Sequence, residues 1–291
     1  MEVEIEKCML LQFTKNSQSL LFITCTMLIS ISQVVLPLTF CGFVQCRIKM
    51  HITSNLEQMI LENENFKLAL NSALHKTDVS GCVLFGDCLE LLPLFANKSV
   101  DYSFTSPPYN RKRNDKYRDF TDINKNWLQL NIDVLNQLLR VTKKHIFYNI
   151  QANYYNRQDV YKLIGLFSKS IVDIHIWEKS NPMPASGKNI TNAVEYFLVL
   201  GNESLKSNTT YTKNIITTSV NSNMPKEHKA VMKTDVAEHF ISKFTNENDI
   251  ILDCFFGYGT TGIVAKELKR FFIGIEKEKS YYEMSVERCG L

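Results

Sequence analysis

The chain has 291 residues, 45% of them hydrophobic, and a formal net charge of +3. Its length allows one α/β domain with a substantial core, and its small charge means that evidence for nucleic-acid binding has to come from local basic clusters. The eight cysteines include no CxxC pair and no pairing with histidines at metal-ligand spacing. We therefore predict buried thiols in a reducing compartment and no metal site.

Residues 1–49 form a hydrophobic N-terminal extension. Within it, residues 20–44 are mostly apolar and carry no charge, and this run is long enough to cross a bilayer. Arg47 and Lys49, directly afterwards, favour a cytosolic C-terminal side. Three interpretations stay open: a true membrane anchor, a non-native extension upstream of Met50, and a buried helix. The expected location is the cytoplasm or, with a true anchor, a membrane with the main domain in the cytosol.

Residues 50–291 have the pattern of one α/β domain. Stretches with apolar residues at helical spacing alternate with short apolar runs typical of strands, which indicates a doubly wound, mostly parallel sheet covered on both faces. The neighbouring strands 171–177 and 195–200 are expected to form an antiparallel edge. The polar residues 201–232 are expected to be irregular, as a small recognition insert. The other expected strands are 82–85, 100–104, 145–150, 250–255 and 271–276, and the expected helices are 54–75, 127–139, 160–167 and 263–268.

A short polar motif, Ser106-Pro107-Pro108-Tyr109, follows the strand expected near residue 104. Proline cannot donate a ladder hydrogen bond, so the chain leaves the sheet here, and residues before proline are held extended. The Ser106 hydroxyl and the Pro107 carbonyl can each accept one N–H of an exocyclic amine, while Tyr109 stacks on the ring that carries it. The alternative is an ordinary proline-rich turn after a strand.

The next segment, residues 110–126, is polar and combines basic with aromatic side chains. A solvated loop is one explanation. We call Ser106 and Pro107 together the amine clamp, and a basic and aromatic loop directly after it would also suit contacts with nucleic-acid phosphates. The residues expected to bind nucleic acid are Asn110, Arg111, Lys112, Arg113, Lys116 and Arg118.

A second signal lies near the C-terminus, where a buried-type strand runs into FGYGTTG at residues 256–262. Glycines at alternate positions allow a tight turn and the close approach of a ligand, with a helix N-terminus behind them. Glu276 ends the next strand about 20 residues later, where a nucleotide-type βαβ unit binds a ribose diol. Asp87 ends the strand 82–85 in a similar place, although it would equally suit a helix cap. The pattern indicates an adenosine-bearing cofactor.

Other nucleotide-binding motifs fit this region less well. A dinucleotide site is disfavoured by the bulky Tyr258 and by the absence of a basic residue for phosphate within the run. A P-loop is excluded because no Gly-Lys-Ser/Thr triplet occurs here. S-adenosylmethionine has no phosphates and needs only the close turn, the acid and a pocket for its adenine and methionine ends, so it is the expected cofactor.

Together these residues resemble the amino-group DNA methyltransferases, in the permuted (beta) class whose catalytic motif precedes the cofactor motif. The run TSPPYN at 105–110 is similar to the catalytic signature of that family, and DCFFGYGTTG at 253–262 looks like its cofactor loop. The resemblance covers roughly residues 80–289 and implies a Rossmann-like, S-adenosylmethionine-dependent fold. The segment 228–232 departs from the family, because it lacks the His-Pro pair that many relatives show.

The resemblance also implies the roles of single residues. The catalytic motif would comprise Ser106, Pro107, Pro108 and Tyr109, and the acid after the first strand would lie near the cofactor adenine. The expected cofactor-binding residues are Asp87, Asp253, Phe255, Gly257, Gly259, Thr260 and Glu276.

The implied reaction is methyl transfer to an exocyclic amine of a flipped base in double-stranded DNA. Ser106 in the first clamp position, instead of Asp or Asn, favours N4 of cytosine over N6 of adenine by family analogy. No Pro-Cys dipeptide occurs in the chain, which argues against ring-carbon methylation through a cysteine nucleophile. The alternatives are an RNA or protein-amide N-methyltransferase and a non-catalytic, membrane-tethered binding protein. A homodimer and a cognate restriction endonuclease are candidate partners.

Overall fold

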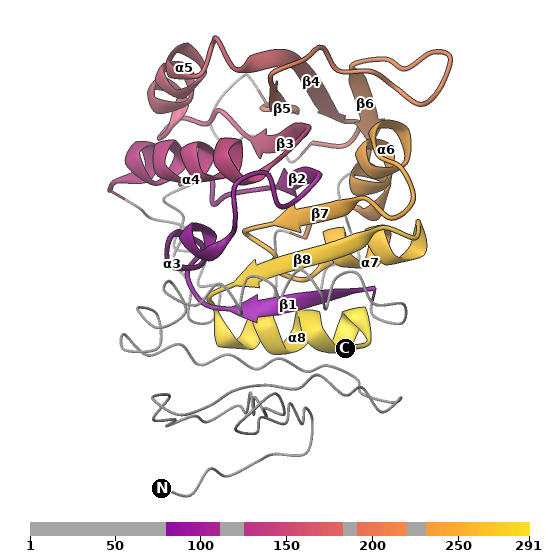
Figure 1. Ribbon diagram of the computed structural model, residues 1–291. Coiled ribbons are helices and arrows are strands. Elements are labelled where there is room, and N and C mark those ends of the chain that lie inside the picture. The colour runs from indigo at the N-terminus through magenta and orange to yellow at the C-terminus, as the bar shows by residue number, and fades with distance from the viewer. Residues whose placement is uncertain (1–79, 111–124, 183–190, 220–230) are drawn as a thin grey trace, which may run out of the picture.

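Eight strands form one sheet with helices on both faces (Figure 1). The computed structural model describes residues 80–110, 125–182, 191–219 and 231–291. The strands are β1 (Gly81–Phe85), β2 (Tyr102–Thr105), β3 (His145–Ile150), β4 (Ile171–Lys179), β5 (Val194–Gly201), β6 (Ile215–Thr218), β7 (Ile250–Asp253) and β8 (Phe271–Glu276). The helices are α3 (Cys88–Leu91), the short 3-10 helix η1 (Leu92–Leu94), α4 (Trp127–Val141), α5 (Arg157–Leu166), α6 (Thr234–Phe244), α7 (Thr260–Glu267) and α8 (Lys279–Cys289). The predicted α/β fold class is confirmed.

The strands lie in the order β1-β8-β7-β2-β3-β5-β4-β6. Neighbours are parallel throughout, except that β5 runs antiparallel to both β3 and β4. The expected antiparallel part of the sheet is therefore present, but its reversed strand lies inside the sheet, with β4 and β6 beyond it. β5 pairs with β4 on one side and with β3 on the other.

Two hydrophobic layers cover the two faces of the sheet. Helices α3, α4 and α5 pack on one face, and α6, α7 and α8 pack on the other (Figure 1). Successive residues of a strand point to opposite faces: in β5, Leu198 packs in the first layer, whereas Phe197 and Val199 pack in the second. Both sides of the central strands are thus buried, which is why they read as continuous apolar runs.

Residues 215–218 differ from the expectation of an irregular insert over 201–232. They form β6, which pairs in parallel with β4 in the register Trp177↔Ile216. Ile216 is buried against the layer of α6, while Ile215 is exposed. The prediction was wrong for this strand because four residues give too short an alternation to stand out in a polar segment.

Some predictions fall on residues that the structure does not describe. The apolar run 20–44 and the helix expected over 54–75 lie outside the described residues, as do Arg111, Lys112, Arg113, Lys116 and Arg118. Among the described residues, no helix is both long and apolar enough to cross a bilayer.

Candidate active site

The two sequence motifs lie side by side at one edge of the sheet. β2 and β7 are parallel neighbours, so their C-terminal ends meet, and the motifs begin there. Thr105 links them: its Oγ1 donates to Asp253 Oδ1 at 2.7 Å and accepts from the backbone N–H of Phe255 at 3.2 Å. We call this row of strand ends, from β1 to β3, the C-terminal edge.

The catalytic motif is held by its backbone carbonyls. The Pro108 carbonyl accepts from the Trp127 indole, and the Tyr109 carbonyl accepts from the side-chain amides of Asn153 and Asn156, each at 2.8 Å. In contrast, the Pro107 carbonyl, although its residue is buried, accepts no hydrogen bond from any group of the described chain. Among the carbonyls of residues 107–109, the Pro107 carbonyl, which is expected to accept from an amine, is thus the one without a partner in the described chain.

The Tyr109 hydroxyl is held by three side chains. Its Oη lies 2.9 Å from Ser106 Oγ, 2.9 Å from Asn149 Oδ1 and 2.8 Å from Glu195 Oε2. The other Glu195 oxygen accepts from the ammonium of Lys179. The hydrogen bonds of the hydroxyl therefore fix the orientation of the Tyr109 ring without any contact from a substrate.

Asp253 ends β7 and is almost completely buried. Burial raises the pKa of its carboxyl group to about 6, although hydrogen bonds from Thr261, Thr105 and the Phe255 backbone lower it in part. Both of its oxygens accept from hydroxyl groups, Oδ1 from Thr105 and Oδ2 from Thr261 at 2.6 Å. Asp253 thus ties the end of β2 to the start of α7.

The glycine turn follows Asp253 and has the backbone that glycine permits. Gly257 (φ 53°) and Gly259 (φ 78°) both lie in the left-handed region, where side chains are disfavoured. A Cβ on Gly259 would also approach Ser285 and Cys289 of α8 to 3.2 and 3.3 Å. The expected close turn in front of a helix N-terminus is present.

Glu276, at the end of β8, lies directly beside that turn. Its Oε2 accepts from Gly257 N at 2.7 Å, and its Oε1 accepts from Glu278 N at 2.8 Å. Burial raises the pKa of this carboxyl to about 7, while the two backbone N–H groups lower it in part. Each oxygen keeps a further lone pair, so the carboxylate can still accept from a diol.

The remaining predicted site residues lie around these groups. Asp87 caps α3 by accepting from Leu89 N at 2.9 Å, and its other oxygen lies 3.8 Å from Lys277 Nζ. The capping alternative for Asp87 is therefore correct, and its adenine contact stays a prediction. Phe255 and Thr260 flank the turn, and Asn110, which is buried with φ 54°, ends the catalytic motif.

The sequence did not single out five polar residues that support the motif: Asn149, Asn153, Asn156, Lys179 and Glu195. Asn153 and Asn156 are the only pair with a visible signal, because two asparagines three residues apart before a helix are typical of a capped turn. Each also accepts a backbone N–H of the other. The other three lie at strand ends that only the sheet order brings together.

A basic side chain also approaches the glycine turn. Arg288 of α8 donates to the Tyr258 carbonyl at 2.7 Å, and its guanidinium lies 4.0 Å from the centre of the Tyr258 ring. This cation comes from outside the glycine run, so the sequence of the run did not reveal it. Its contacts hold it on Tyr258, at an exposed position.

Comparison with known proteins agrees with this geometry. The family model for N6/N4 methyltransferases, described as DNA methylase, matches residues 100–287. The chain belongs to this DNA methylase family. The match covers both motifs of the C-terminal edge.

Curated relatives are type II methyltransferases. M.MwoI of Methanothermobacter wolfeii is 31% identical over 238 residues, which cover 73% of this chain but only 35% of M.MwoI. M.HinfI of Haemophilus influenzae is 26% identical, over 72% of this chain and 68% of its own. The chain thus spans about a third of the first of these relatives and about two thirds of the second.

Solved structures show the same fold. The PvuII DNA methyltransferase (cytosine-N4-specific) aligns with 73% of this chain and 87% of its own, with a TM-score of 0.61 and 19% identity. The M1.HpyAVI-SAM complex aligns with 72% of this chain and 100% of its own, with a TM-score of 0.53 and 25% identity. The Rossmann-like methyltransferase fold expected from the motifs is confirmed.

Proposed function

We propose that this DNA methylase transfers a methyl group from S-adenosylmethionine to an exocyclic amine of a flipped base in double-stranded DNA. The observation that carries the proposal is the Pro107 carbonyl beside Ser106, which has no hydrogen-bond partner among the described residues and lies at a strand end adjacent to the glycine turn. An amine has two N–H bonds, and we assign one acceptor to each, the Ser106 hydroxyl and the Pro107 carbonyl. Family membership supplies DNA as the substrate class.

The residues of the glycine turn fit S-adenosylmethionine. The left-handed turn at Gly257 and Gly259 exposes backbone without side chains, and Glu276 offers lone pairs for the ribose hydroxyls. Asp87, Asp253, Phe255 and Thr260 complete the set that we assign to the cofactor. When bound, S-adenosylmethionine would supply an electrophilic methyl group on a sulfonium.

The amine clamp would increase the low nucleophilicity of the substrate amine. An aromatic amine is a poor nucleophile because its lone pair is delocalised into the ring. Ser106 Oγ and the Pro107 carbonyl orient both N–H bonds and favour a pyramidal nitrogen, whose lone pair can then attack in line. Tyr109, fixed through its hydroxyl, would stack on the base.

We favour N4 of cytosine over N6 of adenine as the acceptor. The support is Ser106 in the first clamp position, where Asp or Asn would favour adenine by family analogy. The PvuII structure is named cytosine-N4-specific, but at 19% identity its likeness supports the fold alone. Sequencing that detects both modified bases, on host DNA with and without the protein, separates the two acceptors.

The clamp is tested with Ser106→Ala and Ser168→Ala. Ser168 is an exposed serine after α5 and serves as the matched control. We expect Ser106→Ala to lower the methyl-transfer rate by about 10²-fold or more, because one of the two oriented acceptors is lost. The affinity for S-adenosylmethionine, measured by calorimetry, should stay within about twofold, since Ser106 lies in the catalytic motif and not in the glycine turn.

Wild-type turnover in Ser106→Ala would contradict the clamp. Competition among duplex DNA, RNA and a peptide amide for labelled methyl tests the carrier of the amine, and preferred labelling of RNA or peptide would overturn the DNA assignment. Failure of the wild-type protein to bind S-adenosylmethionine would favour a non-catalytic binding protein.

A further inference from the structure

Three contacts converge on the Tyr109 hydroxyl, which has a single proton to give. The partners are Ser106 Oγ, Asn149 Oδ1 and Glu195 Oε2, at 2.9, 2.9 and 2.8 Å. A phenol offers one O–H donor and two acceptor lone pairs. Tyr109 can therefore donate in only one of these contacts, and the other two hydrogen bonds have to be donated to it.

Glu195 is the partner that has to accept. Its side chain is 3% exposed, and its second oxygen accepts from Lys179 Nζ, whose side chain is 11% exposed. A carboxylate paired with an ammonium in a buried site is an acceptor only, and a bond from a hydroxyl to a carboxylate is the strongest one available to Tyr109. The Tyr109 hydroxyl thus donates its hydrogen bond to Glu195.

This assignment fixes the direction of the Ser106 hydroxyl. Either oxygen of the Ser106–Tyr109 contact could be the donor by geometry, and because the Tyr109 proton is committed to Glu195, Ser106 donates to Tyr109. The remaining lone pairs of Ser106 Oγ are then available to a substrate. One chain of donors runs from Ser106 through Tyr109 to Glu195.

The Asn149 side chain can supply the second hydrogen bond donated to Tyr109 if its amide group is rotated by about 180°. The turn presents its NH2 group to a Tyr109 lone pair, and the two orientations of an amide have nearly the same shape. In the opposite orientation, the Asn149 Nδ2 is fully buried without a partner in the part of the chain that the structure describes. The turned amide leaves its oxygen in that buried place instead, so the contact with Tyr109 decides the orientation: once the Tyr109 proton points to Glu195, only the NH2 group of Asn149 can form the hydrogen bond at 2.9 Å.

We propose that Ser106, Tyr109 and Glu195 form a relay that removes the proton released when the substrate amine is methylated, with Lys179 holding Glu195. The inference rests on the proposed function. Methylation forms an N–C bond and breaks the C–S bond of the sulfonium, whose sulfur keeps the electron pair. The methylated amine then carries one surplus proton.

The relay disposes of that proton in one concerted shift. The surplus proton passes to Ser106 Oγ, the Ser106 proton passes to Tyr109 Oη, and the Tyr109 proton passes to Glu195 Oε2. The products are a neutral methylated base and a neutral Glu195, with both hydroxyl groups restored. After the base leaves, the proton returns along the same groups to water.

The test compares Glu195→Gln with wild type in single-turnover methyl transfer, at saturating S-adenosylmethionine and duplex DNA, across pH 6 to pH 9. Glutamine keeps the shape but takes up no proton, so we expect a rate about 10²-fold lower near neutral pH. The deficit should shrink as the pH rises, because hydroxide can then accept the proton. Cofactor affinity by calorimetry should stay within about twofold.

A matched control and a second variant show whether the loss of rate is specific to the relay. Glu178→Gln changes an exposed glutamate on β4 that bonds Thr217, and it should behave as wild type. Tyr109→Phe breaks the relay without touching Glu195, and it should lose a similar factor. The double variant Tyr109→Phe/Glu195→Gln should be no slower than the slower single variant, since both break one chain.

A readout without turnover checks the hydrogen bonds themselves. In the apoprotein, proton NMR should show a slowly exchanging, low-field hydroxyl resonance that disappears in Tyr109→Phe, moves upfield in Glu195→Gln and is unchanged in Glu178→Gln. Wild-type rates at every pH in Glu195→Gln, or additive losses in the double variant, would overturn the relay while leaving the proposed function intact. A wild-type protein without methyl transfer would overturn the proposed function instead.

Discussion

The two ends of the parallel strands carry very different polar groups. At the C-terminal edge, Asp253 and Glu276 are buried carboxylic acids whose pKa values are raised to about 6 and about 7 by burial. The Pro107 carbonyl there has no partner among the described residues. This edge holds hydrogen-bonding capacity that the fold itself does not use up.

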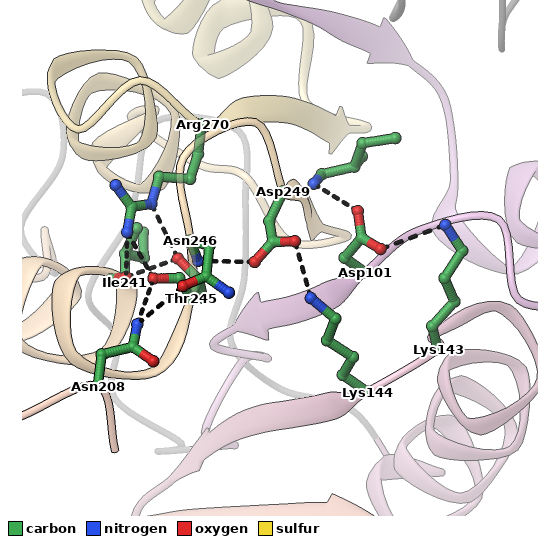
Figure 2. Close-up of polar contacts among 10 residues, drawn as sticks. Asp101, Lys143, Lys144, Asn208, Ile241, Thr245, Asn246, Asp249 and Arg270 are labelled. Atoms are coloured by element: carbon green, nitrogen blue, oxygen red, sulfur yellow. Dashed lines mark hydrogen bonds and ion pairs between the residues drawn. The ribbon is translucent and has the colours of Figure 1, made fainter. Parts of the chain in front are cut away.

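At the N-terminal edge, where the same strands begin, the carboxylates of Asp101 and Asp249 find their partners within the chain (Figure 2). Asp101, before β2, accepts from Ile250 N at 2.9 Å and pairs with Lys143 at 3.2 Å. Asp249, before β7, accepts from Asn246 N at 2.7 Å and pairs with Lys144 at 2.8 Å. Each carboxylate thus joins one backbone N–H to one ammonium.

The difference separates a stabilising edge from a functional one. Polar groups with complete partners add stability, whereas buried acids with raised pKa values and unpartnered acceptors lower it and are retained at sites that bind or react. Substitutions at the N-terminal edge should therefore change the free energy of unfolding, and substitutions in the catalytic motif should change the rate. Three predictions test this division.

The largest stability effect is expected for Arg270→Met at the N-terminal edge. Arg270 is 9% exposed, and its guanidinium donates to the carbonyls of Thr245 and Leu268 and to the Thr245 hydroxyl. Methionine keeps the length but removes all three donated bonds, and only the Thr245 carbonyl keeps another donor, the Asn208 side-chain amide at 2.7 Å. The free energy of unfolding should therefore fall by about 2–4 kcal/mol. Urea unfolding followed by circular dichroism measures it.

The control for Arg270 is an exposed ion pair. Lys162→Ala removes the partner of Asp159 on α5, where the lysine side chain is 63% exposed, and should change the free energy of unfolding by less than about 0.5 kcal/mol. Methyl transfer per folded molecule should be unchanged in Arg270→Met. A large loss of rate without a loss of stability would show that the N-terminal edge also serves the reaction.

The sequence predicts some residues of the candidate active site and misses others, for physical reasons. Ser106 and Tyr109 can be recognised because they flank two consecutive prolines, and Glu276 because it follows the glycine turn at a fixed spacing. Glu195 is the second residue of the apolar strand β5, and only the antiparallel insertion of β5 between β3 and β4 brings it to Tyr109. Contacts across the sheet depend on strand order, which local patterns do not contain.

The next prediction uses the titration of Asp253. Because burial raises its pKa from an ordinary 3.8 to about 6, the folded protein holds this proton over a range where the unfolded chain has lost it. The stability from the protonated form is complete below pH 3.8 and is lost as the pH rises through about 6. Asp253→Asn lacks this titration.

We therefore compare the apoprotein and Asp253→Asn from pH 4 to pH 7. The free energy of unfolding of wild type should fall relative to the variant by about 2–3 kcal/mol over this range, from a pKa difference of about 2. Taking the difference cancels groups that do not interact with Asp253, such as the half-buried His239. Glu276 cancels only in part, because the charge of Asp253 contributes to its raised pKa. A difference that does not change with pH would mean that Asp253 is ionised throughout and belongs with the satisfied carboxylates.

The smallest effect separates the two bonds of Asp101. Lys143 is 46% exposed, so Lys143→Ala should lower the free energy of unfolding by less than about 0.5 kcal/mol, and by less still in high salt, because water screens an exposed ion pair. Asp101→Ala also removes the acceptor of Ile250 N, a part-buried bond between β2 and β7, and should lower it by about 1–2 kcal/mol at any salt concentration. Urea unfolding at two ionic strengths distinguishes them. Equal losses in both variants would mean that the ammonium, and not the backbone bond, holds this edge together.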